Sequence, residues 1–269
     1  MDTLKRRLVS FPALVLAWAL GWVLLPLWLP GAVGFDLARR WPWLALRGAL
    51  AALVYLNAEL AGVVLALAFT PLRLLGRARY LNAHFALQAA WARALYGALA
   101  RIYGMTTQLS GREALAGAGP VVVFVRHVSQ LDSLLPAAFL SRATGWRLRY
   151  VLKSELLWSP ALDLVGNRLP NHFVRRAALR GRGEIEAVAR LGSGLKPGEG
   201  TLIFPEGTAL SPERRVRALA ALARRDPALH ARAEAMPHVM PPQLGGALAL
   251  LDAAPQADAV FVAHTGLEG

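Results

Sequence analysis

The sequence contains no cysteine among its 269 residues. A disulfide scaffold, a thiolate metal site and a cysteine nucleophile are therefore all excluded. Charge is also scarce, at 17% of residues against roughly 25% in an average soluble domain. Hydrophobic residues make up 55%, and the mean hydropathy is +0.39. This excess of apolar over charged residues indicates a membrane protein.

Lysine is rare as well, because it occurs only at Lys5, Lys153 and Lys196, and the other 27 of the 30 basic residues are arginine. Acidic residues number 17, so the formal net charge is 30 − 17 = +13. A surplus of this size calls for an anionic partner, either nucleic acid, a lipid headgroup surface or a phosphorylated substrate. The apolar composition argues against nucleic acid, and we expect no nucleic-acid partner.

The first hydrophobic segment is an uncharged run of 28 residues, 8–35. As a helix it would be about 42 Å long, enough to cross the hydrocarbon core of a bilayer. Pro26, Pro30 and Gly31 predict that the helix stops or bends near Leu25. The alternative is a signal peptide, but the run is long for a signal h-region of about 7–15 residues. We therefore predict a first membrane helix.

A second apolar run, 48–72, contains a single charged residue, Glu59. Because a carboxylate is costly in lipid, Glu59 and Asn57 should face the first helix or a polar cavity. The basic residues outside the two runs outnumber those in the connector by six to three, which predicts both termini in the cytoplasm. The alternative is that both helices dip into one leaflet. Residues 1–78 thus read as a two-helix membrane anchor.

The remainder, 79–269, has the pattern of a globular domain. Residues 80–103 carry large apolar groups at helical spacing and predict an amphipathic helix that ends at Gly104. Short runs rich in valine, isoleucine and aromatics predict strands, and helical segments separate them. The predicted strands are 121–125, 148–152, 201–204 and 259–263, and the predicted helices are about 131–142, 184–191, 213–224 and 244–251. This alternation predicts an α/β domain with a mostly parallel sheet flanked by helices.

Residues that follow the strands matter most, because ligands of parallel sheets bind beyond the carboxyl ends of the strands. The first predicted strand is followed by Arg126 and His127, and the second by Lys153. The third is followed by 205–208 and the fourth by His264. The sequence therefore predicts two histidines, a lysine and a carboxylate at one edge of the sheet.

His127 is followed by Ser129 and Asp132. The S-x-x-D spacing is typical of a helix cap, which would account for the aspartate without any catalytic role. Alternatively, the carboxylate folds back onto the imidazole and fixes its tautomer, so that the other ring nitrogen can accept a proton. Such a pair, with no serine or cysteine nucleophile, suits a reaction in which the substrate supplies the attacking hydroxyl.

A second motif is Phe204-Pro205-Glu206-Gly207-Thr208. The proline ends the strand and the glycine frees the backbone for close approach to a ligand. A plain turn would explain these two residues but not the glutamate. A third group consists of Lys153 at the end of the second predicted strand and the paired Arg175 and Arg176 further along the chain. These basic residues suit phosphate binding, although a solvated basic surface is the alternative.

From about residue 120 onward, the order and spacing of these motifs resemble the lysophospholipid acyltransferase family, best known for the 1-acylglycerol-3-phosphate acyltransferases. The resemblance implies that 79–269 is an acyltransferase domain with His127 and Asp132 as catalytic residues. It assigns substrate binding to Lys153, Phe173, Arg176, Phe204, Pro205, Glu206, Gly207 and Thr208.

The activity implied by this resemblance is fatty acyl transfer to the free hydroxyl of a lysophospholipid. The donor would be acyl-CoA or acyl carrier protein, and the acceptor most simply 1-acylglycerol-3-phosphate, giving phosphatidic acid. The implied reaction needs no metal and no cofactor. The expected location is a bacterial inner membrane, with the catalytic domain on the cytoplasmic side and the lipid bilayer as partner.

Two positions depart from the family pattern. Arg126 stands where many members have asparagine, and Ala209 stands where an arginine is often credited with binding the acceptor phosphate. Arg176, Lys153 or Arg214 would then bind that phosphate, or the acceptor is a different lysophospholipid. A lipid hydrolase and an inactive lipid-binding protein are the rival interpretations. Related chains generally continue further, so an end at Gly269 is consistent with truncation at the C-terminus.

Overall fold

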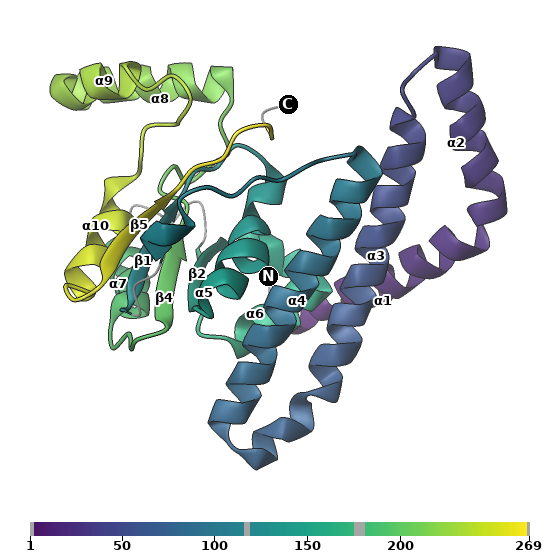
Figure 1. Cartoon of the computed structure of the whole chain (residues 1–269), viewed down its shortest axis with the longest axis horizontal. Helices are drawn as coiled ribbons and strands as arrows, with labels where there is room; N and C mark the ends of the chain where they lie inside the picture. The colour runs from purple at the N-terminus through teal and green to yellow at the C-terminus, as the bar shows by residue number, and fades with distance from the viewer. Residues whose placement is uncertain (1–2, 116–118, 175–180, 268–269) are drawn as a thin grey trace. The chain divides into compact units, whose positions relative to one another are not determined.

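The computed structural model describes residues 3–115, 119–174 and 181–267 (Figure 1). The chain divides into two compact units. The first comprises Met1–Arg112 and Glu155–Leu169, and the second comprises Glu113–Ser154 and Pro170–Gly269.

The first unit is helical. Its elements are α1 (Thr3–Val23), α2 (Leu25–Arg39), α3 (Leu44–Ala68), the 3₁₀ segment η1 (Thr70–Leu75), α4 (Arg77–Tyr103) and α6 (Pro160–Arg168). The predicted break near Leu25 is confirmed, because α1 ends at Val23 and α2 begins at Leu25. Pro26, in the first turn of α2, has no backbone N–H and so cannot donate the hydrogen bond that would continue α1. The predicted amphipathic helix ending at Gly104 is also present as α4. Two helical segments, Thr3–Val23 and Leu44–Leu75, are long and apolar enough to cross a membrane.

The polar residues of α3 point to two different helices. Asn57 faces α1 as predicted, because its Oδ1 accepts hydrogen bonds from Trp18 Nε1 at 3.0 Å and Trp22 Nε1 at 3.3 Å. Glu59 instead faces the start of α6, where its carboxylate accepts from Ser159 Oγ at 2.7 Å and from the Ala161 amide at 3.1 Å. This position satisfies free amide groups at the helix N-terminus, where a negative charge is favourable. The sequence did not predict α6, so it could not predict this partner.

A second carboxylate fixes α6 against α1. Asp163 is fully buried, and its oxygens accept from Arg6 Nη2 at 2.8 Å and Arg7 Nε at 2.7 Å. Asn167 Nδ2, one turn further along α6, donates to the same carboxylate at 2.7 Å. Two of the basic residues before the first apolar run are therefore paired inside the protein.

We expect Asp163→Asn to lower the free energy of unfolding by about 3–5 kcal/mol, because breaking a buried ion pair leaves an uncompensated buried charge. Thermal unfolding in detergent measures the effect. Asp252→Asn is the matched control, since Asp252 is exposed on α10. Equal thermal midpoints for wild type and Asp163→Asn would show that the contacts of Asp163 with Arg6 and Arg7 make no net contribution to stability.

The second unit contains one five-stranded sheet. Its strands are β1 (Val121–Val125), β2 (Arg147–Lys153), β3 (His172–Val174), β4 (Glu199–Ile203) and β5 (Asp258–Val262). The order is β3-β2-β4-β1-β5, and all described pairings are parallel, which confirms the predicted α/β class. All five side chains of β1 are buried, as expected for an inner strand of a parallel sheet.

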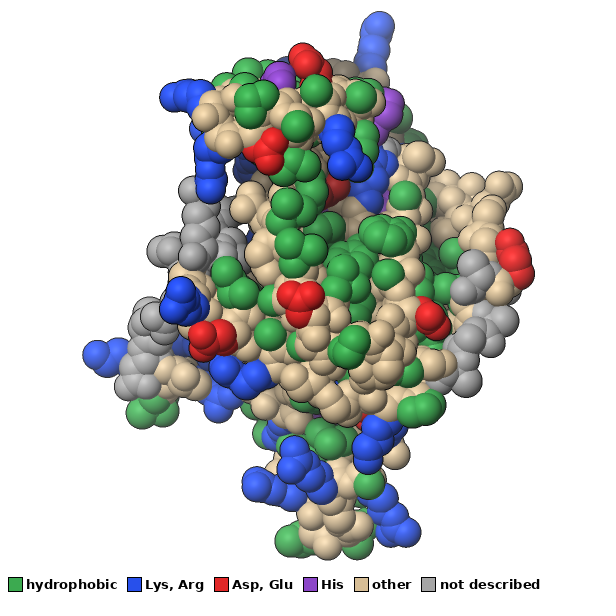
Figure 2. Space-filling model, turned by 90° about the vertical axis from the view of Figure 1, so that its left-hand side faces the viewer, with side chains coloured by type: hydrophobic (Ala, Val, Ile, Leu, Met, Phe, Trp, Pro, Cys, Tyr) green, Lys and Arg blue, Asp and Glu red, His purple; other side chains and the backbone are tan. Residues whose placement is uncertain are grey.

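Helices α7 (Arg182–Gly192) and α10 (Leu244–Ala253) pack on the sheet through Val188, Leu191 and Leu250, which form a core with Val122 and Phe124. Helices α8 (Pro212–Arg225) and α9 (Pro227–Glu234) follow β4, and the described side chains of α8 are all at least partly exposed. Arginine side chains stand out on the surface of this helix pair (Figure 2).

The predicted helix 131–142 is wrong as a single helix. The structure divides the region into the 3₁₀ turn η3 (Gln130–Ser133), the π-helical η4 (Pro136–Leu140) and the short α5 (Ser141–Thr144). Pro136 explains part of this break, because it has no N–H for a regular helical ladder. Two further 3₁₀ segments are η2 (Arg112–Leu115) and η5 (Ser154–Trp158).

Candidate active site

The site lies where β1 ends. The Arg126 amide continues the sheet by donating to the Val262 carbonyl of β5 at 3.0 Å. The next residue, His127, is held through both of its backbone polar groups. Its N–H donates to Glu206 Oε2 at 2.9 Å, and its carbonyl accepts from the Leu210 amide at 2.9 Å. The loop after β4 thus fixes the backbone of His127.

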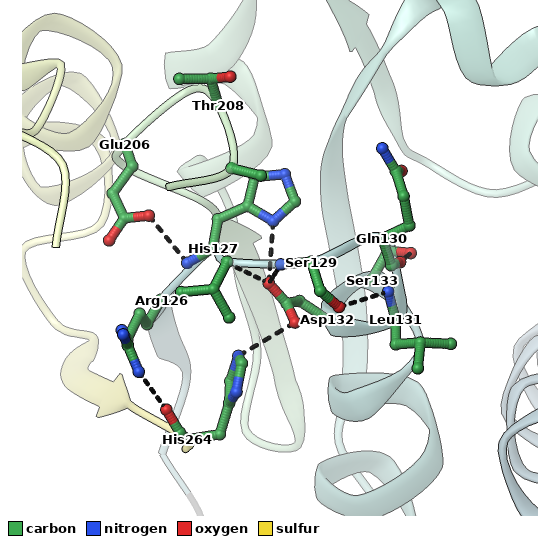
Figure 3. Close-up of polar contacts among 12 residues, drawn as sticks. Arg126, His127, Ser129, Gln130, Leu131, Asp132, Ser133, Glu206, Thr208 and His264 are labelled. Carbon is green, nitrogen blue, oxygen red and sulfur yellow. Dashed lines mark hydrogen bonds and ion pairs between the residues drawn. The ribbon is translucent and has the colours of Figure 1, made fainter. Parts of the chain in front are cut away.

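The imidazole of His127 contacts Asp132 (Figure 3). His127 Nδ1 lies 3.1 Å from Asp132 Oδ2, and the same oxygen accepts from the Ser129 amide at 2.7 Å and from the Val128 amide. Ser129 Oγ in turn accepts from the Leu131 amide at 3.0 Å, which completes a capping box around η3. A single oxygen of Asp132 therefore both caps the start of η3 and contacts the His127 imidazole, as the two interpretations of the sequence had it.

This geometry determines the protonation of the pair. Burial alone raises the pKa of Asp132, but the hydrogen bonds from His127, Ser129 and Val128 outweigh it, and the pKa lies below its ordinary value of 3.8. Asp132 is thus an ionised acceptor, so neutral His127 carries its proton on Nδ1 and an electron pair on Nε2. Nε2 points away from Asp132 (Figure 3). The pair has the arrangement of a general base.

The motif 204–208 forms a turn beside His127. The amide of Gly207 donates to the Phe204 carbonyl at 3.0 Å, and Gly207 has φ +66°, in the left-handed region that favours glycine. The Phe204 ring lies 4.9 Å from the His127 ring, centroid to centroid. The Pro205 carbonyl accepts from the Gln243 amide at 2.6 Å. These contacts place the turn against the imidazole.

Glu206 is nearly fully buried in this turn. Burial raises its pKa from the ordinary value of 4.5 to about 7, although the hydrogen bond from the His127 amide and the charge of Arg126 oppose the shift. The negative charge of Asp132 adds to the increase. The carboxyl group therefore changes charge near neutral pH while bonded to the backbone of His127.

His264 also reaches Asp132, from the chain after β5. Its Nε2 lies 3.2 Å from Asp132 Oδ1. Arg126 Nη1 donates to the His264 carbonyl, and Arg126 Nε donates to the His238 carbonyl at 2.9 Å. The rule that strand ends meet at one edge predicted that His264 would lie at this edge, but not that it would contact Asp132.

Comparison with known proteins identifies the family. A family model described as Acyltransferase matches residues 106–243, slightly more than half of the chain. The chain belongs to the Acyltransferase family. This is the family of the 1-acylglycerol-3-phosphate acyltransferases. No curated protein and no solved structure matches the chain.

Other predicted substrate-binding residues of this acyltransferase lie further along the sheet. Lys153 ends β2, and Phe173 is in β3. The strand order puts β2 two strands and β3 three strands from β1, which is roughly 10 and 14 Å at the usual strand spacing. The sheet therefore does not bring these two side chains beside His127. Arg176 lies outside the described residues.

Arg214, in the first turn of α8, lies beside the motif of the acyltransferase. Its Nη1 donates to Thr208 Oγ1 at 3.0 Å and approaches the Ala209 carbonyl at 3.5 Å. It is exposed. Among the described parts of the chain, no three His, Asp or Glu side chains are grouped so that they could hold a metal ion.

The pKa of Glu206 predicts a pH dependence of stability. Between about pH 4.5 and pH 7 the folded chain keeps the Glu206 proton that the unfolded chain releases, so this group makes the free energy of unfolding fall as the pH rises. Glu206→Gln removes the titration but keeps an acceptor for the His127 amide. We expect the thermal midpoint of the variant to fall less across this window than that of wild type. Parallel pH curves for the two proteins would contradict the prediction.

Proposed function

We propose that this acyltransferase is membrane-bound and transfers a fatty acyl group from acyl-CoA or acyl carrier protein to the free hydroxyl of a lysophospholipid. The proposed acceptor is 1-acylglycerol-3-phosphate, and the product is phosphatidic acid. One observation carries the proposal: the contact between His127 and Asp132, 3.1 Å long, beside the turn 204–208. This pair offers a base, and the reaction needs no nucleophile from the protein because the acceptor brings a hydroxyl.

In the proposed mechanism, His127 Nε2 removes the proton of the acceptor hydroxyl while the oxygen attacks the thioester carbonyl. The tetrahedral intermediate then breaks its C–S bond, and the leaving thiolate takes the proton from the imidazolium. Asp132 holds the ring and stabilises its positive charge during the transfer. Proton transfer of this kind typically accelerates a reaction by about 100- to 10,000-fold. Neither a metal nor a cofactor takes part in the proposed steps.

Arg214 is the residue that we propose for the acceptor phosphate. Its guanidinium lies against Thr208, within the motif that the family resemblance assigns to the glycerophosphate. Arginine suits phosphate because its planar donors bind two oxygens at once. Arg214 would thus supply the guanidinium that the Ala209 position lacks. Lys153, Phe173 and Arg176 stay predicted contacts to the remainder of the substrate.

The membrane part of the proposal rests on two features. Thr3–Val23 and Leu44–Leu75 could anchor the chain where the acceptor and product reside. Exposed arginines of α8, among them Arg217, Arg224 and Arg225, would attract anionic headgroups, at about 1 kcal/mol each near the surface. The excess of basic residues outside the two hydrophobic runs favours a cytoplasmic catalytic domain, which in a bacterium means the inner membrane.

The central experiment measures acyl transfer by membranes that contain the full chain, with labelled oleoyl-CoA or oleoyl carrier protein and a panel of lysophospholipids. We expect phosphatidic acid from 1-acylglycerol-3-phosphate. His127→Ala and Asp132→Asn should lower kcat by at least about 100-fold, because each removes the general base or its orientation. His230→Gln, on α9, is the matched histidine control.

Other outcomes of this assay identify the rival functions. Release of free oleate without an acceptor would indicate a lipid hydrolase. Normal membrane binding with no turnover would indicate an inactive lipid-binding protein. Equal product from wild type and His127→Ala would refute the proposed mechanism.

A separate prediction concerns the phosphate. Arg214→Ala should raise the KM for 1-acylglycerol-3-phosphate by about 10- to 100-fold, the usual range for losing a charge-assisted hydrogen bond. The KM for the acyl donor should stay close to that of wild type. Arg190→Ala, which removes an exposed arginine of α7, is the control. An unchanged acceptor KM in Arg214→Ala would exclude Arg214 from phosphate binding.

A further inference from the structure

The two carboxylate oxygens of Asp132 have different surroundings. Oδ2 accepts hydrogen bonds from two backbone amides and contacts His127 Nδ1. Oδ1 is buried and has no hydrogen-bond partner among the described residues. The group that faces it is His264, whose Nε2 lies 3.2 Å away, within ion-pair distance but without a hydrogen bond. The carboxylate therefore lies between two imidazoles (Figure 3).

His264 is held in this position by the sheet and by Arg126. Strand β5 pairs in parallel with β1, with Val262 opposite Val125. His264 follows two residues after Val262, at the edge where His127 lies. The Arg126 side chain donates to the His264 carbonyl, which fixes the backbone of the residue. The side chain of His264 is mostly buried, so its approach to Asp132 is not a chance contact of a mobile surface group.

We infer that His264 is a positioning residue for the base: its imidazole lies within ion-pair distance of Oδ1 of Asp132 and limits the rotation of the carboxylate, so that Oδ2 stays directed at His127. The inference rests on the proposed function of His127 and Asp132. A buried carboxylate oxygen without a hydrogen bond is costly, and a polar ring nitrogen 3.2 Å away reduces that cost. His264 acts through Asp132 and does not itself contact the acceptor.

The contact also links the two histidines electrostatically. Among the described residues, His264 faces Asp132, its carbonyl is bound by Arg126, and His127 and Glu206 lie near the same carboxylate. Both imidazoles face the one negative charge of Asp132, so a change at His264 alters the electrostatic surroundings of His127. Removing His264 leaves the whole carboxylate charge to His127.

The test uses full-length His264→Gln and His264→Ala, with His230→Gln as control, in the acyl-transfer assay. We expect His264→Ala to lower kcat by about 10- to 100-fold through misplacement of the base, with both KM values nearly unchanged. His264→Gln should recover part of this loss, because its amide can donate to Oδ1.

A second measurement does not require activity. NMR of histidine-labelled protein in detergent follows the Nδ1–H resonance of His127, assigned by its loss in His127→Gln. We expect this resonance to shift in His264→Gln, because the partner of Nδ1, the Asp132 carboxylate, is placed differently, and to stay in place in His230→Gln. Thermal unfolding verifies that each variant is folded, and His264→Gln serves where His264→Ala does not fold.

The outcomes separate the two proposals. Acyl transfer that needs His127 but is the same in wild type and both His264 variants would overturn the role of His264 and leave the proposed function standing. Absence of acyl transfer in wild type would overturn the proposed function. In that case the NMR measurement decides the inference, and an unchanged His127 Nδ1–H resonance in His264→Gln would overturn it as well.

Discussion

The buried carboxylate of Asp132 is the group on which the whole site depends. A buried carboxylate needs polar partners, and here the backbone of the loop after β1 and the His127 imidazole bind Oδ2, while the His264 imidazole faces Oδ1. The same hydrogen bonds that make the carboxylate tolerable inside the protein keep it ionised, with its pKa below the ordinary value. An ionised Asp132 then fixes the tautomer of His127. The hydrogen bonds to Asp132 therefore stabilise the folded loop and also orient the His127 imidazole.

The parallel sheet explains why these groups meet. Strand β1 lies between β4 and β5, so the chains that leave the three strands emerge next to one another at one edge. β1 brings His127, β4 brings Glu206 and β5 brings His264. Because the loop after β4 bonds to both the N–H and the carbonyl of His127, the imidazole is placed by backbone contacts as well as by Asp132. Three distant parts of the sequence thus share one small volume.

Much of this arrangement follows from the sequence, because strand runs are short, apolar and bounded by turn residues. The five residues of β1 and the position of His127 were predictable from that pattern. The contact between His264 and Asp132 was not, since strand order is a long-range property that one sequence does not reveal. The partner of Glu59 was not predictable for a similar reason. Its carboxylate binds the start of α6, a nine-residue helix with no marked hydrophobic run in the sequence. The broken region 131–142 reflects capping around Asp132 and the proline at 136, which outweigh its helical spacing.

The arginine surplus takes on a more limited meaning in the structure. Composition alone assigns a net charge of +13 to an anionic partner. Arg6 and Arg7, however, bind a buried aspartate, and Arg126 binds two backbone carbonyls. Such arginines are held by contacts within the fold. Arg214 and the exposed arginines of α8 are different, because their guanidinium groups reach solvent. Part of the charge that can attract a phosphate or a headgroup therefore lies next to the turn 204–208, on the helix that follows it.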